Sequence, residues 1–312
     1  MQRNRGPARP PAAGRRQRLK LVAVPVLASI ACVGWAASWA FASPPRSFNG
    51  VPLPKVADRI VSLTDAATED LFSMGAGKQV VAADEYSTYP KDAPTTKLNP
   101  FEPNVEAIAT YRPDLVVTSQ NVNHLGSQLA ALHIPMLYLP APANLQGEYA
   151  QMQELGVATG REPQASQLVS KLKRRVAAIV RSVKRPHSPI TVYDELDQTY
   201  YSASSKTFVG QIYTLLGLRN IADKAAKTSV YPQLSSEYIV AADPDLIVLA
   251  DTVCCGQSAK TVGKRPGWNQ ITAVKDGDIL AVNDTIASEW GPRIVDFLAE
   301  VATAVRRVES QR

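Results

Sequence analysis

Two stretches of the chain carry the same pattern: Glu106-Ala-Ile-Ala-Thr-Tyr-Arg-Pro-Asp-Leu-Val-Val117 and Glu237-Tyr-Ile-Val-Ala-Ala-Asp-Pro-Asp-Leu-Ile-Val248. Glu, Ile, Pro, Asp, Leu and Val recur at a constant offset of 131 residues, which indicates an internal repeat of a whole lobe. Each copy reads as a short helix that ends at a proline and is followed by a buried, β-branched strand. The chain is therefore predicted to contain two α/β lobes of one design.

Strand-like and helix-like segments alternate around each copy of the repeat. Before the first copy, residues 59–63 and 79–83 read as strands on either side of a helix over 66–74. After it, residues 125–132 and 145–158 read as helices on either side of a strand over 136–139. Such alternation predicts mostly parallel sheets that are covered on both faces.

One long amphipathic segment, residues 163–184, interrupts this alternation. Its apolar residues recur every three or four positions, as on one face of a helix. A helix of this length reaches about 33 Å, enough to cross from one lobe to the other. The predicted fold class is α/β, with two Rossmann-like lobes that have mostly parallel sheets and are joined by one long rigid helix. The expected parts of this body are an N-terminal lobe, an interlobe helix and a C-terminal lobe over residues 58–160, 161–187 and 188–312.

The N-terminal region has the pattern of an export signal. Residues 1–20 hold seven Lys or Arg and no acid, residues 21–42 hold no charge, and the run ends at Ala40-Phe-Ala42. Residues 1–42 are therefore predicted to be a signal peptide or an N-terminal membrane anchor, since 22 uncharged residues also suffice to span a bilayer. Residues 43–57 are expected to be a linker. Either way the body is expected to be exported and extracytoplasmic, secreted or held at the outer face of the cytoplasmic membrane.

The net charge of +6 does not indicate a nucleic-acid binder. Without the seven basic residues of the N-terminal region, 27 basic and 28 acidic residues remain, a net charge of −1. A body without a basic surplus has nothing to attract a phosphate backbone. We therefore expect no nucleic acid among the partners.

Two adjacent cysteines, Cys254 and Cys255, stand in the second lobe. No Cys or His lies nearby at ligand spacing, so no metal site is predicted. Outside the reducing cytosol two neighbouring thiols can close a vicinal disulfide, although ring strain opposes it. The sequence leaves a disulfide and two reduced thiols as alternatives.

The residues that an enzyme would need are missing from the pattern. The chain has no Gly-x-Ser-x-Gly and no His-Glu-x-x-His motif, and its three histidines are isolated. Gly75-Ala-Gly-Lys78 is no phosphate loop, because Gln79 replaces the required Ser or Thr. The chain is predicted not to be an enzyme, and no cofactor is expected.

Aromatic side chains stand where loops follow or precede the predicted strands and helices. In open α/β sheets ligands bind at such loops, and aromatic rings can hold a large, flat, partly apolar ligand by stacking. Each ring taken alone is compatible with ordinary packing at a lobe edge. Together they predict a ligand cleft that is lined by Tyr86, Phe101, Tyr200, Tyr231 and Trp290.

Several motifs together resemble a known family. They are residues 59–69 (Arg-Ile-Val-Ser-Leu-Thr-Asp-Ala-Ala-Thr-Glu), Tyr86-Ser-Thr-Tyr-Pro90, both Pro-Asp-Leu runs and Gly291-Pro-Arg-Ile-Val-Asp296. Over about residues 58–308 the chain resembles the iron-siderophore and vitamin B12 (cobalamin) substrate-binding proteins of ABC importers. These form the helical-backbone class, or class III, of periplasmic binding proteins.

The resemblance implies a receptor that captures a metal chelate between its lobes and delivers it to a homodimeric ABC permease with ATPase subunits. It also implies that Glu106 and Glu237 dock to arginines of the permease. A pseudo-symmetric pair of carboxylates suits a two-fold partner. Each Glu equally suits the positive end of its own short helix. A sensor or scaffold of the same fold without transport is the alternative function.

The resemblance leaves the ligand open. Tyr231 replaces a tryptophan of the cobalamin binders, Glu289 stands where an Arg is expected, and Ser119 stands where another tryptophan is expected. The candidates are therefore cobalamin or a related corrinoid, a ferric siderophore, or haem. An anionic chelate would need cations such as Arg265 or Arg293, although Arg293 reads as structural at the start of the last helix.

Overall fold

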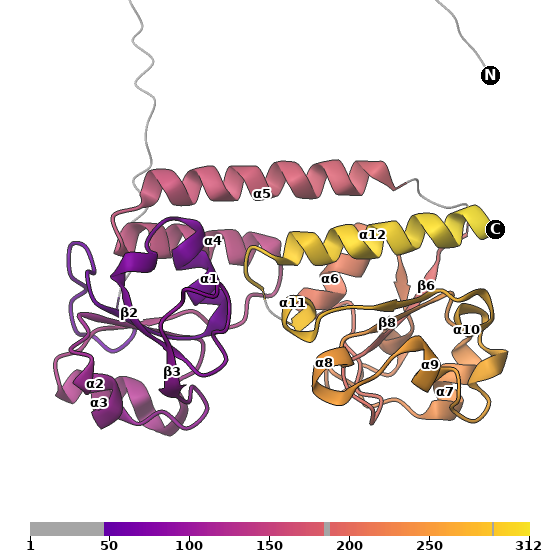
Figure 1. The fold of residues 1–312 in the computed structure, drawn as a ribbon, viewed down its shortest axis with the longest axis horizontal. Helices are drawn as coiled ribbons and strands as arrows, with labels where there is room; N and C mark the ends of the chain where they lie inside the picture. The colour runs from indigo at the N-terminus through magenta and orange to yellow at the C-terminus, as the bar shows by residue number, and fades with distance from the viewer. Residues whose placement is uncertain (1–46, 184–187, 289) are drawn as a thin grey trace, which may run out of the picture. The chain divides into compact units, whose positions relative to one another are not determined.

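The protein is described from a computed structural model, which places residues 47–183, 188–288 and 290–312 (Figure 1). All of them belong to one compact unit, Ser43–Arg312. The predicted export segment, residues 1–42, lies outside the described residues. None of the helices in the described part of the chain combines the length and the hydropathy that crossing a membrane requires.

The first lobe is built on a five-stranded sheet in the order β3-β2-β1-β4-β5, with every neighbouring pair parallel. Its strands are β1 (Ile60–Leu63), β2 (Val80–Asp84), β3 (Thr95–Leu98), β4 (Leu115–Thr118) and β5 (Met136–Tyr138). Its helices are α1 (Asp65–Ser73), α2 (Val105–Thr110), α3 (Leu125–Ala131) and α4 (Leu145–Ala158).

The second lobe is built on a four-stranded sheet in the order β7-β6-β8-β9, again parallel throughout. Its strands are β6 (Thr191–Glu195), β7 (Arg219–Asn220), β8 (Leu246–Leu249) and β9 (Ile279–Ala281). Its shorter helices are α6 (Phe208–Leu215), α7 (Ser236–Ala242), α8 (Thr252–Cys255), α9 (Ala259–Val262), α10 (Thr272–Asp276) and α11 (Asp284–Ser288). The prediction of two α/β lobes with parallel sheets is confirmed.

The repeat has the same structural task in both lobes. Strands β4 and β8 occupy equivalent residues, 131 positions apart, and all four residues of each are buried. The repeated aspartate accepts hydrogen bonds at the start of the neighbouring strand. Asp114 accepts from the backbone N–H of Arg59 at 3.0 Å, and Asp245 accepts from that of Thr191 at 2.7 Å. Each Pro-Asp pair therefore ends a helix and aligns two parallel strands.

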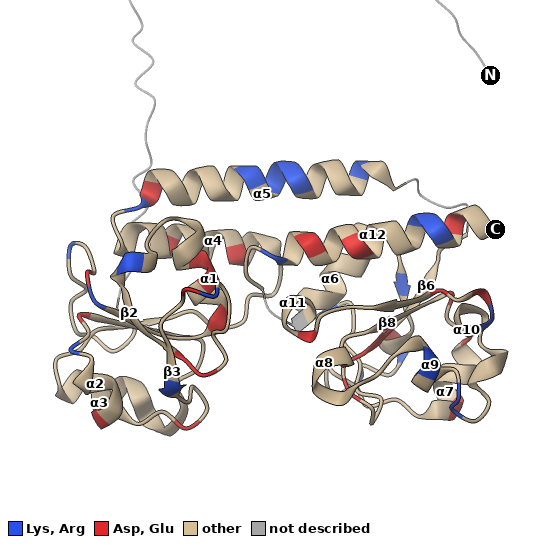
Figure 2. Cartoon of the chain, viewed as in Figure 1, with Lys and Arg blue, Asp and Glu red and all other residues tan. Residues whose placement is uncertain are grey.

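Two long helices run alongside each other: α5 (Glu162–Ser182) and α12 (Ile294–Gln311) (Figure 1). The 21 residues of α5 reach about 32 Å, which confirms the predicted long helix. Helix α12 packs on α6 and β8 of the second lobe and also on α5. Helix α5 carries several basic residues and the first half of α12 carries acidic ones (Figure 2). Arg175 of α5 pairs with Asp296 of α12 at 2.7 Å.

Candidate functional site

A cavity of about 660 Å³ opens at the carboxyl ends of the strands of the first lobe. The strand order reverses between β1 and β4, which is the point at which open parallel sheets bind ligands. The lining comes from the ends of β1, β2 and β4, from the segment before α2 and from the segment around α11. The lining residues are Leu63, Thr64, Asp65, Asp84, Glu85, Tyr86, Thr88, Pro100, Phe101, Ser119, Gln120, Thr285 and Trp290.

Aromatic rings form the apolar part of this lining. Tyr86 and Phe101 meet edge to face, with their ring centres 5.6 Å apart, although they are 48% and 53% exposed. Trp290, which precedes α12, lines the same cavity. Exposed large rings that gather in a hollow are typical of a ligand site. The structure thus brings three of the five predicted cleft residues together.

Asp84 shapes the loop that carries Tyr86. Its Oδ1 accepts hydrogen bonds from the backbone N–H groups of Tyr86 and Ser87 at 2.9 and 3.2 Å, and its Oδ2 accepts from the Ser87 hydroxyl at 2.7 Å. Burial raises the pKa of Asp84 against these hydrogen bonds, and the charge of Asp65 adds to the rise. The Ser87 hydroxyl also lies 3.0 Å from that of Thr68 on α1. This buried polar chain holds the loop against the lobe.

The charged residues of the lining are all acidic. Asp65 and Glu85 contribute carboxyl groups, whereas the carboxyl group of Asp84 is buried and engaged by its own loop. No Lys, Arg or His is found among the described lining residues. Carboxyl oxygens accept hydrogen bonds from amides and attract positive charge. The cavity therefore suits a neutral or cationic ligand that is rich in N–H groups.

The other two predicted cleft residues lie outside this lining. Tyr200 is half-buried and packs on Trp268, with ring centres 5.8 Å apart. Tyr231 is exposed; partial burial of its hydroxyl raises its pKa, and the charge of Asp194 adds to the rise. Both belong to the second lobe.

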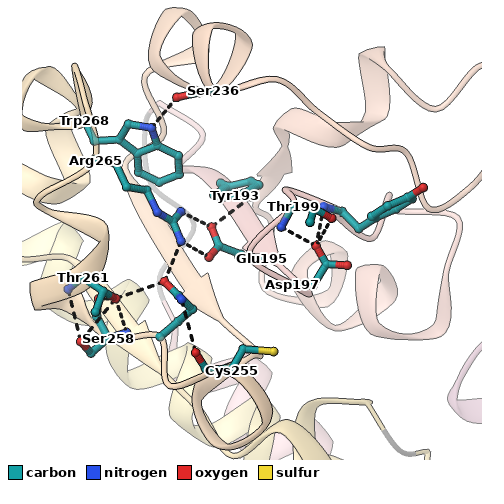
Figure 3. A network of polar contacts seen from close by, with 12 residues as sticks. Tyr193, Glu195, Asp197, Thr199, Ser236, Cys255, Ser258, Thr261, Arg265 and Trp268 are labelled. Atoms are coloured by element: carbon teal, nitrogen blue, oxygen red, sulfur yellow. Dashed lines mark hydrogen bonds and ion pairs between the residues drawn. The ribbon is translucent and has the colours of Figure 1, made fainter.

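An ion pair occupies the corresponding edge of the second lobe (Figure 3). Glu195, at the end of β6, is fully buried and accepts two hydrogen bonds of 2.6 Å from the guanidinium of Arg265. The guanidinium also lies over the rings of Trp268 and Tyr200, at 4.5 and 5.3 Å from their centres. The charge of Arg265 is therefore balanced within the lobe. Beside it, burial raises the pKa of Asp251 to about 7, and the charge of Glu195 adds to this rise.

Arg293 makes the structural contact that its position suggests. Its Nε donates to Oε1 of the buried Glu69 at 2.8 Å, and its guanidinium lies 4.1 Å from the centre of the Tyr89 ring. Both partners belong to the first lobe, whereas Arg293 directly precedes α12.

Glu106 and Glu237 lie in equivalent places, in the first turn of α2 and of α7, and both are exposed. Asn104 and Ser235 cap these helices by accepting from the backbone N–H groups of Ala107 and Tyr238. The backbone N–H of Glu237 and the Ser235 hydroxyl lower the pKa of Glu237. Both glutamates are therefore available to a partner.

The adjacent cysteines lie at the end of α8. The structure joins Cys254 and Cys255 by a disulfide. One carboxylate, that of Asp284, accepts hydrogen bonds from the backbone N–H groups of Thr252, Val253 and Cys254 at 2.7 to 3.0 Å. Although burial opposes them, these donors lower the pKa of Asp284. Val253 is 72% exposed, so this turn presents an apolar tip to solvent.

Sequence reasoning missed the acidic part of the lining. Asp65 lies two residues after the first strand, and Asp84 ends the second strand. These positions at strand ends were the available signal. It also missed Thr285, which no strand precedes directly. In the described part of the chain, no group of three or more Asp, Glu, His or Cys residues could hold a metal ion.

Known proteins that are similar to most of this chain include two binding proteins. A cobalamin-binding protein of Halobacterium salinarum is 31% identical over 86% of this chain and 75% of its own length. An uncharacterised ABC transporter substrate-binding lipoprotein, YvrC of Bacillus subtilis, is 29% identical over 83% of each chain.

Solved structures show the same architecture. The crystal structure of a possible iron-binding (periplasmic solute-binding) protein from Staphylococcus epidermidis matches with a TM-score of 0.69 and 27% identity, covering 80% of this chain and 99% of the other. The profile of the periplasmic binding protein family matches residues 60–285, well over half of the chain. The chain therefore belongs to the periplasmic binding protein family and is a substrate-binding protein, not an enzyme.

Proposed function

We propose that this chain is the extracytoplasmic substrate-binding component of an ABC importer and that its cavity captures a corrinoid such as cobalamin. The observation that carries the proposal is the composition of the cavity, which combines Tyr86, Phe101 and Trp290 with the carboxyl groups of Asp65 and Glu85. A corrinoid presents a flat apolar macrocycle with amide side chains around its rim. The rings can stack on the macrocycle, and the carboxyl groups can accept from the amides.

The charges of the site favour a corrinoid over the other chelates. Haem carries two anionic propionates, and many ferric siderophores are anionic. Either would bring negative charge toward Asp65, Asp84 and Glu85, which is unfavourable in a partly dehydrated cavity. Arg265 cannot compensate, because Glu195 already pairs with it. The cobalamin-binding relative from Halobacterium salinarum supports the same ligand class.

A titration of the purified full chain in mild detergent tests the ligand. Cyanocobalamin, haemin and a neutral ferric hydroxamate are added in turn, and binding is followed by tryptophan fluorescence and calorimetry. We expect saturable binding of cyanocobalamin and none of haemin. Tighter binding of haemin than of cyanocobalamin would contradict the charge argument. Tighter binding of the hydroxamate than of cyanocobalamin would identify a ferric siderophore, and not a corrinoid, as the ligand class.

Variants locate the binding site. Trp290→Ala and Phe101→Ala should each weaken cyanocobalamin about tenfold or more, as central aromatic contacts do. Tyr201→Ala is the matched control, because Tyr201 is an exposed ring that does not line the cavity. Equal losses in all three variants would place the ligand elsewhere.

We further propose that Glu106 and Glu237 dock to a two-fold permease. Two exposed carboxylates at equivalent positions of two lobes can meet the same surface on each permease subunit. The double variant Glu106→Lys/Glu237→Lys should abolish uptake into cells or proteoliposomes and leave ligand affinity unchanged. The double variant Asp92→Lys/Asp276→Lys makes the same change of charge at exposed residues, one in each lobe, and should keep uptake. Normal uptake by the Glu variant would favour a sensor or scaffold.

A further inference from the structure

Arg293 connects the second lobe with the first. It directly precedes α12, and its side chain reaches α1 of the first lobe. Nε donates to Oε1 of Glu69 at 2.8 Å, and a second guanidinium nitrogen pairs with the same oxygen. Only 2% of the Glu69 side chain is exposed. The planar guanidinium of Arg293 also lies over the Tyr89 ring, and its Cζ is 4.1 Å from the ring centre.

These contacts join three segments that line the cavity. Glu69 lies on α1, whose first residue, Asp65, lines the cavity, and Tyr89 lies on the same loop as Tyr86. Trp290 is three residues before Arg293 on the chain. Between them Gly291 packs against α1 so closely that a Cβ there would lie 3.2 Å from Oε2 of Glu69. The backbone that carries Trp290 is therefore held against the first lobe.

The partner of Arg293 lies in an acidic and buried environment. Asp70 and Glu148 are buried beside Glu69. Burial raises the pKa of both groups, and the negative charge of Glu69 adds to each rise. A buried carboxylate with such neighbours needs a cation. Removal of Arg293 takes a cation away from this buried carboxylate, so the effect on stability has to be separated from any effect on the cavity.

We propose that Arg293 is a positioning residue for the ligand: by holding Glu69 and Tyr89 together, it fixes Trp290 and the Tyr86 loop as two walls of a preformed cavity. The inference rests on the proposed function, because it concerns the same cavity. Walls that are ordered before binding spare the ligand the cost of ordering them, which lowers the dissociation constant.

The test uses the full chain labelled with 5-fluorotryptophan, in which Trp290→Phe assigns the Trp290 resonance. Arg293→Gln should lower the melting temperature and weaken cyanocobalamin. Glu69→Gln/Arg293→Gln removes both charges and should recover most of the melting temperature. It should still bind about tenfold more weakly than wild type, the cost of ordering one or two side chains. Its Trp290 resonance should broaden or shift without ligand. Arg175→Gln, which breaks an exposed pair between α5 and α12, is the control; it should change neither the affinity nor the Trp290 resonance and should lower the melting temperature only slightly.

A purely structural bridge predicts a different pattern. If the double variant binds as tightly as wild type and keeps the wild-type Trp290 resonance, the positioning role is refuted. Should the double variant not fold, Arg293→Lys decides, because it keeps the charge but not the planar group over Tyr89. Wild-type affinity and an unchanged resonance in that variant would likewise overturn the inference. If wild type binds no corrinoid, the proposed function fails, and the ligand-free spectra still decide whether Arg293 positions Trp290.

Discussion

Replacing Arg265 by methionine tests whether the network of the second lobe is held by its buried charge. Glu195 is fully buried and has two 2.6 Å hydrogen bonds from Arg265, while the Tyr193 hydroxyl donates a third, weaker one at 3.2 Å. Arg265→Met leaves the buried carboxylate without this cation. Breaking one side of a buried pair typically costs about 3–5 kcal/mol. The lost contacts with Trp268 and Tyr200 act in the same direction.

Urea unfolding, followed by circular dichroism, measures this loss as a fall in the transition midpoint at constant slope. Glu195→Gln/Arg265→Met removes both charges and keeps an acceptor for Tyr193, so it should lie within about 2 kcal/mol of wild type. The control Arg175→Met breaks a pair whose side chains are 43% and 46% exposed and should cost at most about 1 kcal/mol. A loss for Arg265→Met no larger than the control would refute the reasoning, as would a double variant less stable than the single one.

Three further outcomes are expected. Burial raises the pKa of Asp194 to about 7, and the hydrogen bond from the Tyr213 hydroxyl opposes this rise. Because the folded state holds this proton more tightly than the unfolded state, the free energy of unfolding should fall by up to about 4 kcal/mol as the pH rises from about 4 to 7. Asp194→Asn should flatten that slope. Reduction of Cys254–Cys255 should add two alkylatable thiols by peptide mass spectrometry in the folded protein, and alkylation of Cys254 or Cys255 without reductant would contradict the disulfide. Asn144→Ala removes a cap that accepts from two backbone N–H groups of α4 and should cost about 1 kcal/mol in urea, whereas no loss would contradict the capping role.

Local patterns predicted regular elements well where several signals agree. Helix α4 begins and ends at the predicted residues, 145 and 158, because a strong cap and a helical pattern agree. Strand β3 was missed: its sequence, Thr-Thr-Lys-Leu, is half exposed and carries no buried apolar run. The short helices α8 to α11 were missed for a related reason, since segments of four or five residues have too few positions to show a period.

The candidate site was predicted in part, and the limit is physical. Tyr86, Phe101 and Trp290 line one cavity, and they were predicted from their position after a strand or before a helix, which is a local property. The placement of Tyr200 depends on Trp268, which approaches only when the second lobe folds. Aromatic rings that line a cavity and aromatic rings that pack on a neighbouring side chain occur in loops with the same local sequence environment. Sequence alone therefore cannot distinguish them.

The sequence by itself determined the two-lobe α/β design, the long helix and the equivalence of Glu106 with Glu237, because periodicity and repetition are written along the chain. Only the tertiary structure decided which side chains meet. The pair Glu69 and Arg293 is separated by 224 residues, and the pair Glu195 and Arg265 by 70. Such contacts depend on how strands are ordered and helices packed, and these follow from the burial of whole faces rather than from any local signal.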